Sequence, residues 1–208
     1  MKSLACCFLL LLAGSNLRAA TFSVTVTNDS GAGSLRQAIP DANASPGPDL
    51  ITFGITNAGL TISVTNPLPV ITDPVTMDAT TQPGFAGPPV VELNGLNFGS
   101  GQDGLKINTS NSTIRGLVIN RFTGDGIEIT NEFNNVIEGN VIGLNLAATA
   151  RSPNGNGIFI TNSPGTIIGG IFSAQRNVIS GNNQNGIRVD GTNLPGTMVV
   201  GNYIGLNP

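Results

Sequence analysis

The stretch "DGIEITNEFNNVIEGNVIG" (Asp125–Gly143) decides the fold, because its parts recur along the chain. Its opening phrase is Asp or Asn, then Gly, then alternating aliphatic residues. The same phrase occurs as "DGLKI" from Asp103, "NGIFI" from Asn156 and "NGIRV" from Asn185, with spacings of 22, 31 and 29 residues. Self-similarity at such a period indicates a repeat architecture.

Each copy of the opening phrase predicts a short strand. The first and third residues after the Gly are aliphatic, and side chains on a strand alternate between its two faces. The aliphatic residues therefore point inward and the residue between them points outward. The outward residues are Lys106, Glu128, Phe159 and Arg188. We expect them at equivalent places on stacked strands, with Lys106 facing Glu128, and we expect Arg115 to face Glu138 in the same way.

A second strand family follows each opening phrase and has a glycine at a bend. Its copies are "STIRGLVIN" from Ser112, "NVIEGNVIG" from Asn135, "TIIGG" from Thr166 with "NVISGNN" from Asn177, and "MVVGNYIG" from Met198. The phrases "GNVIGLN" at Gly139 and "GNYIGLN" at Gly201 are predicted to be equivalent strands two coils apart.

These repeats predict an all-β fold, a right-handed parallel β-helix (solenoid) over residues 49–208, with regular coils from about residue 103. One coil cannot bury its own aliphatic residues, but coils stacked about 4.8 Å apart bury them as continuous ladders. A globular α/β fold is disfavoured because no amphipathic helical stretch separates the strands. A chain that stops directly after a strand would expose an open strand edge, which predicts end-to-end self-association or a truncated chain.

Residues 21–48 differ from the repeats and are predicted to form a strand and a short capping helix. "TFSVTVTN" (Thr21–Asn28) alternates as a strand does. Ser34 followed by Gln37 matches a capping box, and one helical face is apolar: Leu35, Ala38, Ile39 and Ala42. Such a helix would cover the open strand edge of the first coil. Pro40 is expected to end or kink it early.

Residues 1–20 match a secretory signal peptide, with Lys2 before the apolar run Leu4–Ala13 and small residues at Ala19 and Ala20. The apolar run is too short to span a membrane, which needs roughly 20 residues. Its removal deletes both cysteines, and the protein has no His, so a disulfide or a zinc site of the Cys/His kind is excluded from the remainder. We expect a secreted or cell-surface protein.

The charge balance limits the partners. Charged residues make up 10% of the chain, against roughly 25% in ordinary domains, and the formal net charge is −3. So few basic residues argue against nucleic acid and anionic membranes as partners.

Beyond these patterns, the chain resembles a known group of bacterial proteins. "TFSVTVTNDSGAGSLRQAIPDANASPGPDLITF" (Thr21–Phe53) is similar to the N-terminal module of CSLREA-type bacterial surface proteins, although Gly33 stands where their motif has Cys, and Pro40 is unusual there. "NSTIRGLVINRFTGDGIEI", "RNVISGNNQNGI" and "GNYIGLN" resemble the repeats of their right-handed β-helix domains, of the pectin-lyase-like superfold. The resemblance implies a secreted surface protein and transfers no catalytic residues.

Two functions remain open. The first is a non-catalytic adhesion or polysaccharide-contacting module, whose partner is an extracellular polysaccharide or cell-surface glycan. The alternative is a polysaccharide lyase or glycoside hydrolase acting on acidic glycans. For that alternative the best carboxylates are Asp103, Asp125 and Glu128, but Asn156 and Asn185 fill the slot of the two aspartates, as turn chemistry predicts and catalysis forbids. A lyase would also need calcium, and we see no tight cluster of acids to hold it, so no cofactor or metal is expected.

For the binding function, Phe159, Arg151 and Arg188 are the candidate ligand-binding residues. Phe122, Phe133 and Phe172 are further aromatic candidates near loops. Two loops are expected to bulge from the coils and mark a binding face: Leu146–Gly155 and Gly169–Arg176. Asn140, Asn182 and Asn202 each follow a Gly and are predicted to form an internal asparagine ladder.

Overall fold

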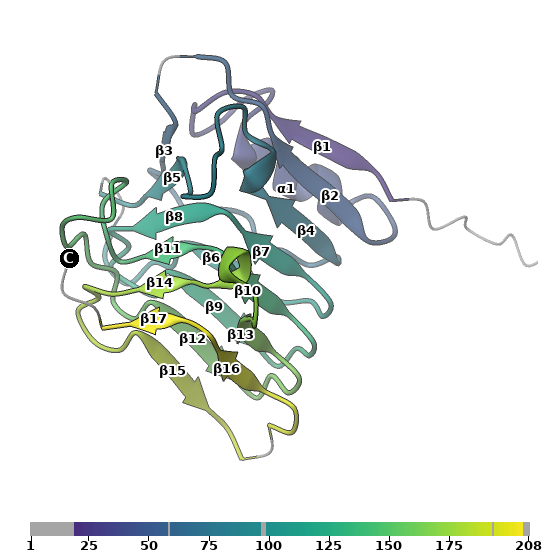
Figure 1. Ribbon diagram of the computed structural model, residues 1–208. Helices are drawn as coiled ribbons and strands as arrows, with labels where there is room; N and C mark the ends of the chain where they lie inside the picture. The colour runs from purple at the N-terminus through teal and green to yellow at the C-terminus, as the bar shows by residue number, and fades with distance from the viewer. Residues whose placement is uncertain (1–18, 58, 97–98, 193, 206–208) are drawn as a thin grey trace, which may run out of the picture.

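The computed structural model describes residues 19–57, 59–96, 99–192 and 194–205 (Figure 1). Apart from Ala19 and Ala20, the signal peptide predicted for residues 1–20 lies outside these residues. The described chain forms three parallel sheets and one α-helix, so the predicted all-β class is confirmed. None of its helices is long and apolar enough to cross a membrane.

The three sheets, named here A, B and C, are each built from strands distant in sequence. In spatial order sheet A contains β1 (Thr21–Val24), β2 (Asp49–Phe53), β4 (Val75–Asp78), β7 (Thr113–Arg115), β10 (Val136–Glu138), β13 (Ile167–Gly169) and β16 (Met198–Val200). Sheet B contains β3 (Thr61–Ser63), β5 (Val91–Asn94), β8 (Leu117–Asn120), β11 (Val141–Ile142), β14 (Val178–Ile179) and β17 (Tyr203–Ile204). Sheet C contains β6 (Leu105–Ile107), β9 (Ile127–Thr130), β12 (Ile158–Thr161) and β15 (Ile187–Asp190).

From β6 onward, consecutive strands pass from sheet C to sheet A to sheet B and then return to sheet C. Each new strand pairs in parallel with the strand three places earlier. In sheet C, Leu105, Ile127, Ile158 and Ile187 are in register. The four predicted "D/N-G" strands are therefore equivalent, as expected. In sheet B, β14 lies between β11 and β17, so the two "GNxIGLN" phrases are two turns of the chain apart (Figure 1).

The second strand family differs from the prediction, because each copy is two strands in different sheets. Gly116 separates β7 from β8 with φ 77°, and Gly139 separates β10 from β11 with φ 65°. A Cβ at Gly116 would lie 2.8 Å from Thr80, and one at Gly139 would lie 2.7 Å from the Ala174 carbonyl oxygen. The glycines thus form a sharp corner that a larger residue could not make without strain.

The core consists of the inward-facing aliphatic side chains. Ile114, Ile137 and Ile168 of sheet A are fully buried and in register, and the other two sheets contribute equivalent rows. Phe122, predicted as a loop aromatic, is instead 1% exposed. Its ring lies where Gly95 and Gly104 have no side chain, since a Cβ at either would come within 3.0 Å of it. Because glycine has no side chain, Gly95 and Gly104 leave the space that the Phe122 ring fills.

One end of the sheets is covered by α1 (Leu35–Asn43), which packs against β1 and β2. The Ser34 side chain accepts the Gln37 N–H at 3.2 Å, but the Gln37 amide bonds Asp41, so only half of the predicted capping box forms. Because α1 continues past Pro40 to Asn43, the expectation that Pro40 ends the helix early is wrong, and the expected kink stays a prediction. Burial of the apolar face, which comprises Leu35, Ala38, Ile39 and Ala42, outweighs the one backbone bond that Pro40 lacks.

At the far end of the sheets lie β15, β16 and β17 (Figure 1). Val189, Val199 and Ile204 occupy inward positions there and are 40–48% exposed. End-to-end self-association through this surface stays a prediction.

Candidate functional site

The outer face of sheet A has a charged row formed by Asp78, Arg115 and Glu138, which are in register on β4, β7 and β10. Arg115 donates from Nη2 to Asp78 Oδ2, and its Nη1 lies 3.7 Å from Glu138 Oε1. The predicted Arg115–Glu138 pair is confirmed. Asp78 was missed because β4 lies in the less regular part of the chain, although "VTMD" aligns with "STIR".

Electrostatics keep two members of this row, Asp78 and Arg115, ionised. Burial opposes ionisation of Asp78, but hydrogen bonds from Arg115 and Thr80 outweigh it and hold the pKa of the Asp78 carboxyl below its ordinary value. The hydrogen bond to Asp78 raises the pKa of Arg115. Asp78 is thus a fixed carboxylate and has no proton to donate as a general acid near neutral pH.

A second row on the same face is uncharged and runs beside the first. Its members are in register across five strands: Thr76, Thr113, Val136, Ile167 and Met198. All of them are partly or fully exposed to solvent. The two rows together form a floor with one apolar side and one charged side.

The corner loop, residues 170–176, overhangs this floor. It contains the 3₁₀ turn η2 (Ser173–Gln175), which stands out between the strands of sheets A and B in Figure 1. Gln175 fixes the loop to β10, because its Nε2 donates to Glu138 Oε2 at 3.0 Å and its carbonyl accepts the Gly139 N–H at 2.9 Å. The loop holds the two most exposed large apolar side chains described, Ile171 at 80% and Phe172 at 66%.

Floor and loop enclose a groove. Its part over sheet A has a volume of about 630 Å³ and is lined by the uncharged row together with Ile171 and Phe172. It continues into a hollow of about 580 Å³ between the corner loop and Phe85. Arg115, Glu138, Phe172 and Gln175 line both parts. The sequence had marked the loop and Phe172 as candidates, and the structure adds the floor beneath them. We call this the sheet A groove.

Two predicted binding residues, Phe159 and Arg188, lie side by side on sheet C, but they contact each other. Phe159 and Arg188 are in register on β12 and β15, and the Arg188 guanidinium covers the Phe159 ring at 4.9 Å from its centroid. Arg188 also pairs with Asp190 at 2.6 Å. The exposed face of the ring is therefore taken by an arginine of the same chain.

Arg151, the third predicted binding residue, lies apart from those two. Its Nε donates to the Gly181 carbonyl at 2.6 Å and its Nη2 donates to Asn183 Oδ1 at 2.7 Å. Arg151 also forms an isolated antiparallel bridge with Leu144. The loop between these two residues, which was predicted to bulge, packs Ala148 against Val118 and Val141 on sheet B. This loop therefore covers a face of sheet B. Of the two loops predicted to mark a binding face, the corner loop is the one that exposes apolar side chains to solvent.

The carboxylates proposed for the enzyme alternative form a turn ladder. Asp103 Oδ1 accepts the Asp125 N–H at 2.7 Å, and Asp125 Oδ1 accepts the Asn156 side-chain amide at 2.7 Å. Asn156 Oδ1 in turn accepts from Asn185. Each side chain bonds the next turn of the chain, as the turn interpretation of this slot predicts.

Glu128 pairs with Lys106, as predicted, and Lys106 also reaches Asp103 of this ladder. Lys106 Nζ lies 2.6 Å from Glu128 Oε2 and 3.2 Å from Asp103 Oδ2. Burial, followed by the proximity of Glu128, raises the pKa of Asp103. Burial also opposes ionisation of Glu128, but the hydrogen bonds with Lys106, Asp103 and Thr130 together outweigh it and lower the pKa of Glu128. Among the described residues, no group of three or more His, Cys, Asp or Glu side chains is placed to hold a metal ion.

The predicted internal asparagine ladder exists with one different member. Asn140, Asn177 and Asn202 are linked by side-chain amides, and Asn140 Nδ2 lies 3.1 Å from Asn177 Oδ1. Asn182 belongs instead to a second ladder with Asn154, at 3.0 Å. The preceding glycine was a misleading signal, because the position relative to the corner decides membership and Asn177 follows Arg176. Both ladders bond backbone carbonyls, and three of their members, Asn140, Asn154 and Asn177, are buried.

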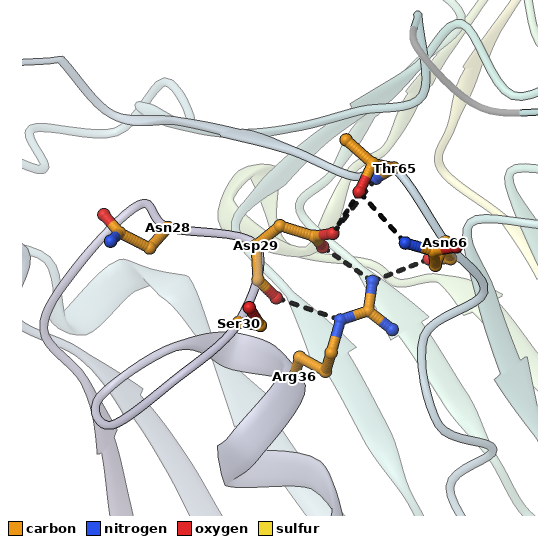
Figure 2. Close-up of a pocket in the computed structure, with 6 residues that line it drawn as sticks. All are labelled: Asn28, Asp29, Ser30, Arg36, Thr65 and Asn66. Atoms are coloured by element: carbon orange, nitrogen blue, oxygen red, sulfur yellow. Dashed lines mark hydrogen bonds and ion pairs between the residues drawn. The ribbon is translucent and has the colours of Figure 1, made fainter.

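A further pocket lies beside α1, where Arg36 meets Asn28, Asp29, Ser30, Thr65 and Asn66 (Figure 2). Arg36 Nη2 is 2.6 Å from Asp29 Oδ1 and 2.7 Å from the Asn66 carbonyl, and Nη1 donates to the Pro67 carbonyl. Asp29 Oδ2 accepts from Thr65. The charged groups satisfy one another, so this pocket is a clamp between the capping segment and residues 65–67 rather than a binding site.

No protein-family model matches the chain, and no curated protein is significantly similar to it. The functional argument therefore rests on the geometry of the sheet A groove.

Proposed function

We propose that the chain is an exported, non-catalytic surface protein of the CSLREA type that binds an extended polysaccharide in the sheet A groove. Its proposed architecture is a right-handed parallel β-helix. The passage of consecutive strands through sheets C, A and B supports this architecture, and parallel crossover connections are right-handed in about 98% of cases.

The observation that supports binding most strongly is that exposed apolar side chains of the corner loop stand beside a floor with both apolar and charged groups. Ile171 and Phe172 stand in solvent on a loop that Gln175 fixes in place. Exposed apolar groups of this kind mark interaction sites, and binding sites combine apolar walls with a few convergent polar groups. A sugar ring has an apolar face for Phe172 and hydroxyls for Thr76, Thr113 and the charged row.

The charges of the floor favour a neutral polysaccharide. Arg115 is already bonded to Asp78 and lies close to Glu138, so two acidic groups face one basic group. The whole chain has a net charge of −3. A polyuronate would be repelled by this surface, whereas the hydroxyls of a neutral glycan can donate to the carboxylates.

A second candidate is glycosidic hydrolysis at the Asp103–Glu128 pair. The observation in its favour is that two neighbouring carboxyl groups have pKa values shifted in opposite directions, as an acid and a base require. Against it, Asp103 Oδ1 is bonded to the Asp125 backbone, and Lys106 bridges both carboxyl groups.

The test incubates the exported protein with neutral and acidic polysaccharides and follows co-sedimentation and chain cleavage. We expect retention on a neutral polymer without new chain ends. Phe172→Ala should weaken retention about tenfold or more, since loss of a central aromatic contact typically costs more than 1.4 kcal/mol. Phe133→Ala is the matched control, because Phe133 is 51% exposed and does not line the groove.

Equal loss of retention in both variants, or retention on no polymer, would contradict the binding proposal. Cleavage that Asp103→Asn and Glu128→Gln abolish would establish the second candidate instead.

A further inference from the structure

Asp49, the first residue of β2, has a buried carboxylate with one unpartnered oxygen. Its residue exposure is 2%. Oδ1 accepts the Ala20 N–H at 2.7 Å and the Ser45 hydroxyl at 3.3 Å. Oδ2 has no hydrogen-bond partner among the described residues, and no Lys or Arg of that part of the chain pairs with Asp49. An ionised carboxylate that is buried with one oxygen lacking a hydrogen bond strongly destabilises the folded chain unless a cation lies next to it.

The atom closest to this carboxylate is a backbone nitrogen at the edge of the predicted signal peptide. As a peptide N–H, Ala20 offers one proton and no charge. As a chain terminus it would offer an α-ammonium, with three donors and a full positive charge, at the same place. We propose that the exported chain is cut between Ala19 and Ala20, and that the new α-ammonium of Ala20 forms a buried ion pair with Asp49.

The chemistry is hydrolysis by a leader peptidase. Water adds to the Ala19 carbonyl carbon, and the C–N bond to Ala20 breaks. Ala19 leaves as the carboxylate end of the leader, and the Ala20 amine takes up a proton. Ala19 is exposed, so the bond is at the surface, while the nitrogen that it releases faces Asp49.

Other cutting positions fit the structure less well. A cut after Ala20 removes the donor to Asp49 and also the carbonyl that accepts the Leu50 N–H at 2.9 Å. An uncut chain leaves Oδ2 unpartnered. Only the cut after Ala19 keeps both existing bonds and adds the missing donors.

Among the elements packed against β2, α1 and β4 carry acidic residues, Arg36 of α1 is bonded to Asp29, and no Lys or Arg of the described residues pairs with Asp49. On the β4 side, Asp73 precedes Pro74, whose carbonyl accepts the Asp49 N–H, and Asp73 Oδ2 is itself buried without a partner among the described residues. On α1, Asp41 bonds Gln37. Further along β4, Asp78 is paired with Arg115. A carboxylate in direct contact favours the ammonium form, so we expect the α-amine beside Asp49 to have a pKa above its ordinary range of about 7.7–8.0.

The first experiment exports the full 208-residue precursor from a secreting bacterial host and determines the first residue of the product by mass and N-terminal sequencing. The expected first residue is Ala20. A product that begins at Thr21, or at any other residue, overturns the assigned cut.

The second experiment measures acylation of the α-amine in the folded product at pH 7 by a soluble active ester. We expect a rate at least about tenfold below that of the same product in denaturant, because only the unprotonated amine reacts and one pKa unit is a factor of ten. Asp49→Asn should restore fast acylation. Asp190→Asn, which removes an exposed carboxylate paired with Arg188, should leave the rate unchanged.

Two outcomes of the acylation experiment would overturn the ion pair. Equal rates in folded and unfolded wild-type product overturn the ion pair, and that comparison remains decisive if Asp49→Asn is not exported. Slow acylation that survives Asp49→Asn also overturns it, since burial alone would then be responsible.

Discussion

At the level of single residues, asparagine and aspartate have different tasks in the two kinds of ladder. In the partly buried turn ladder, Asp103 and Asp125 only accept hydrogen bonds from the next turn, and a carboxylate or an amide oxygen can do so. In the internal ladder, Asn177 must also donate. Its Nδ2 bonds the Ile137 carbonyl at 2.8 Å and Asn202 Oδ1 at 2.9 Å, and its side chain is fully buried.

This difference predicts opposite tolerances. Asp125→Asn should change the free energy of unfolding by less than about 0.5 kcal/mol, because the amide oxygen replaces the acceptor. Asn177→Asp should lower it by about 2–4 kcal/mol, because a buried carboxylate would face two acceptors. Urea unfolding followed by circular dichroism measures both. Similar values for the two variants would refute the division of tasks.

At the level of elements, α1 is tied to distant backbone groups by Arg36 near its start and by Asn43 at its end. Arg36, on α1, bonds Asp29 and the carbonyls of Asn66 and Pro67, thereby joining the helix to a distant connection. Hydrogen bonds from Thr65 and Arg36 outweigh the effect of burial and lower the pKa of Asp29.

Arg36→Gln should therefore loosen α1 without unfolding the sheets. We expect hydrogen exchange of the α1 amides to accelerate about tenfold, a loss of roughly 1.4 kcal/mol, while amides of β9 and β12 keep their rates. Lys106→Gln serves as the control, because it removes a cation from sheet C instead. Acceleration spread evenly over the chain would contradict a local clamp.

At the level of the whole molecule, charges make stability depend on pH at the acid end. Asp29, Asp78 and Glu128 have lowered pKa values in the folded chain. Such groups bind protons more readily in the unfolded chain, so the stability that they contribute is present above their unfolded pKa and is lost as the pH falls through their folded values. The raised pKa of Asp103 acts in the opposite direction and offsets Glu128.

We therefore expect the free energy of unfolding to fall below about pH 4, mainly through Asp29 and Asp78. Asp78→Asn should flatten this dependence, whereas Asp190→Asn, an exposed control, should not. Urea midpoints measured from pH 7 to pH 3 give the comparison. A wild-type curve without a fall in this window would show that these ion pairs contribute no net stability.

The sequence by itself determined the strands of sheet C, their repeat, and which of their side chains face one another. Aliphatic residues at every second position and an Asx-Gly pair in each turn are local signals, and repetition multiplied them. For this reason the sequence predicts the Lys106–Glu128 and Arg115–Glu138 contacts. It also predicts the corner loop and the helix α1.

Only the tertiary structure decided which side chains of different turns meet. Phe122 is buried because Gly95 and Gly104, from other turns, leave room for it. Asp78 joins Arg115 across 37 residues, and Asn177 rather than Asn182 completes a ladder. These outcomes depend on which turns of the chain become neighbours, and in repeats of unequal length no local pattern specifies that neighbour.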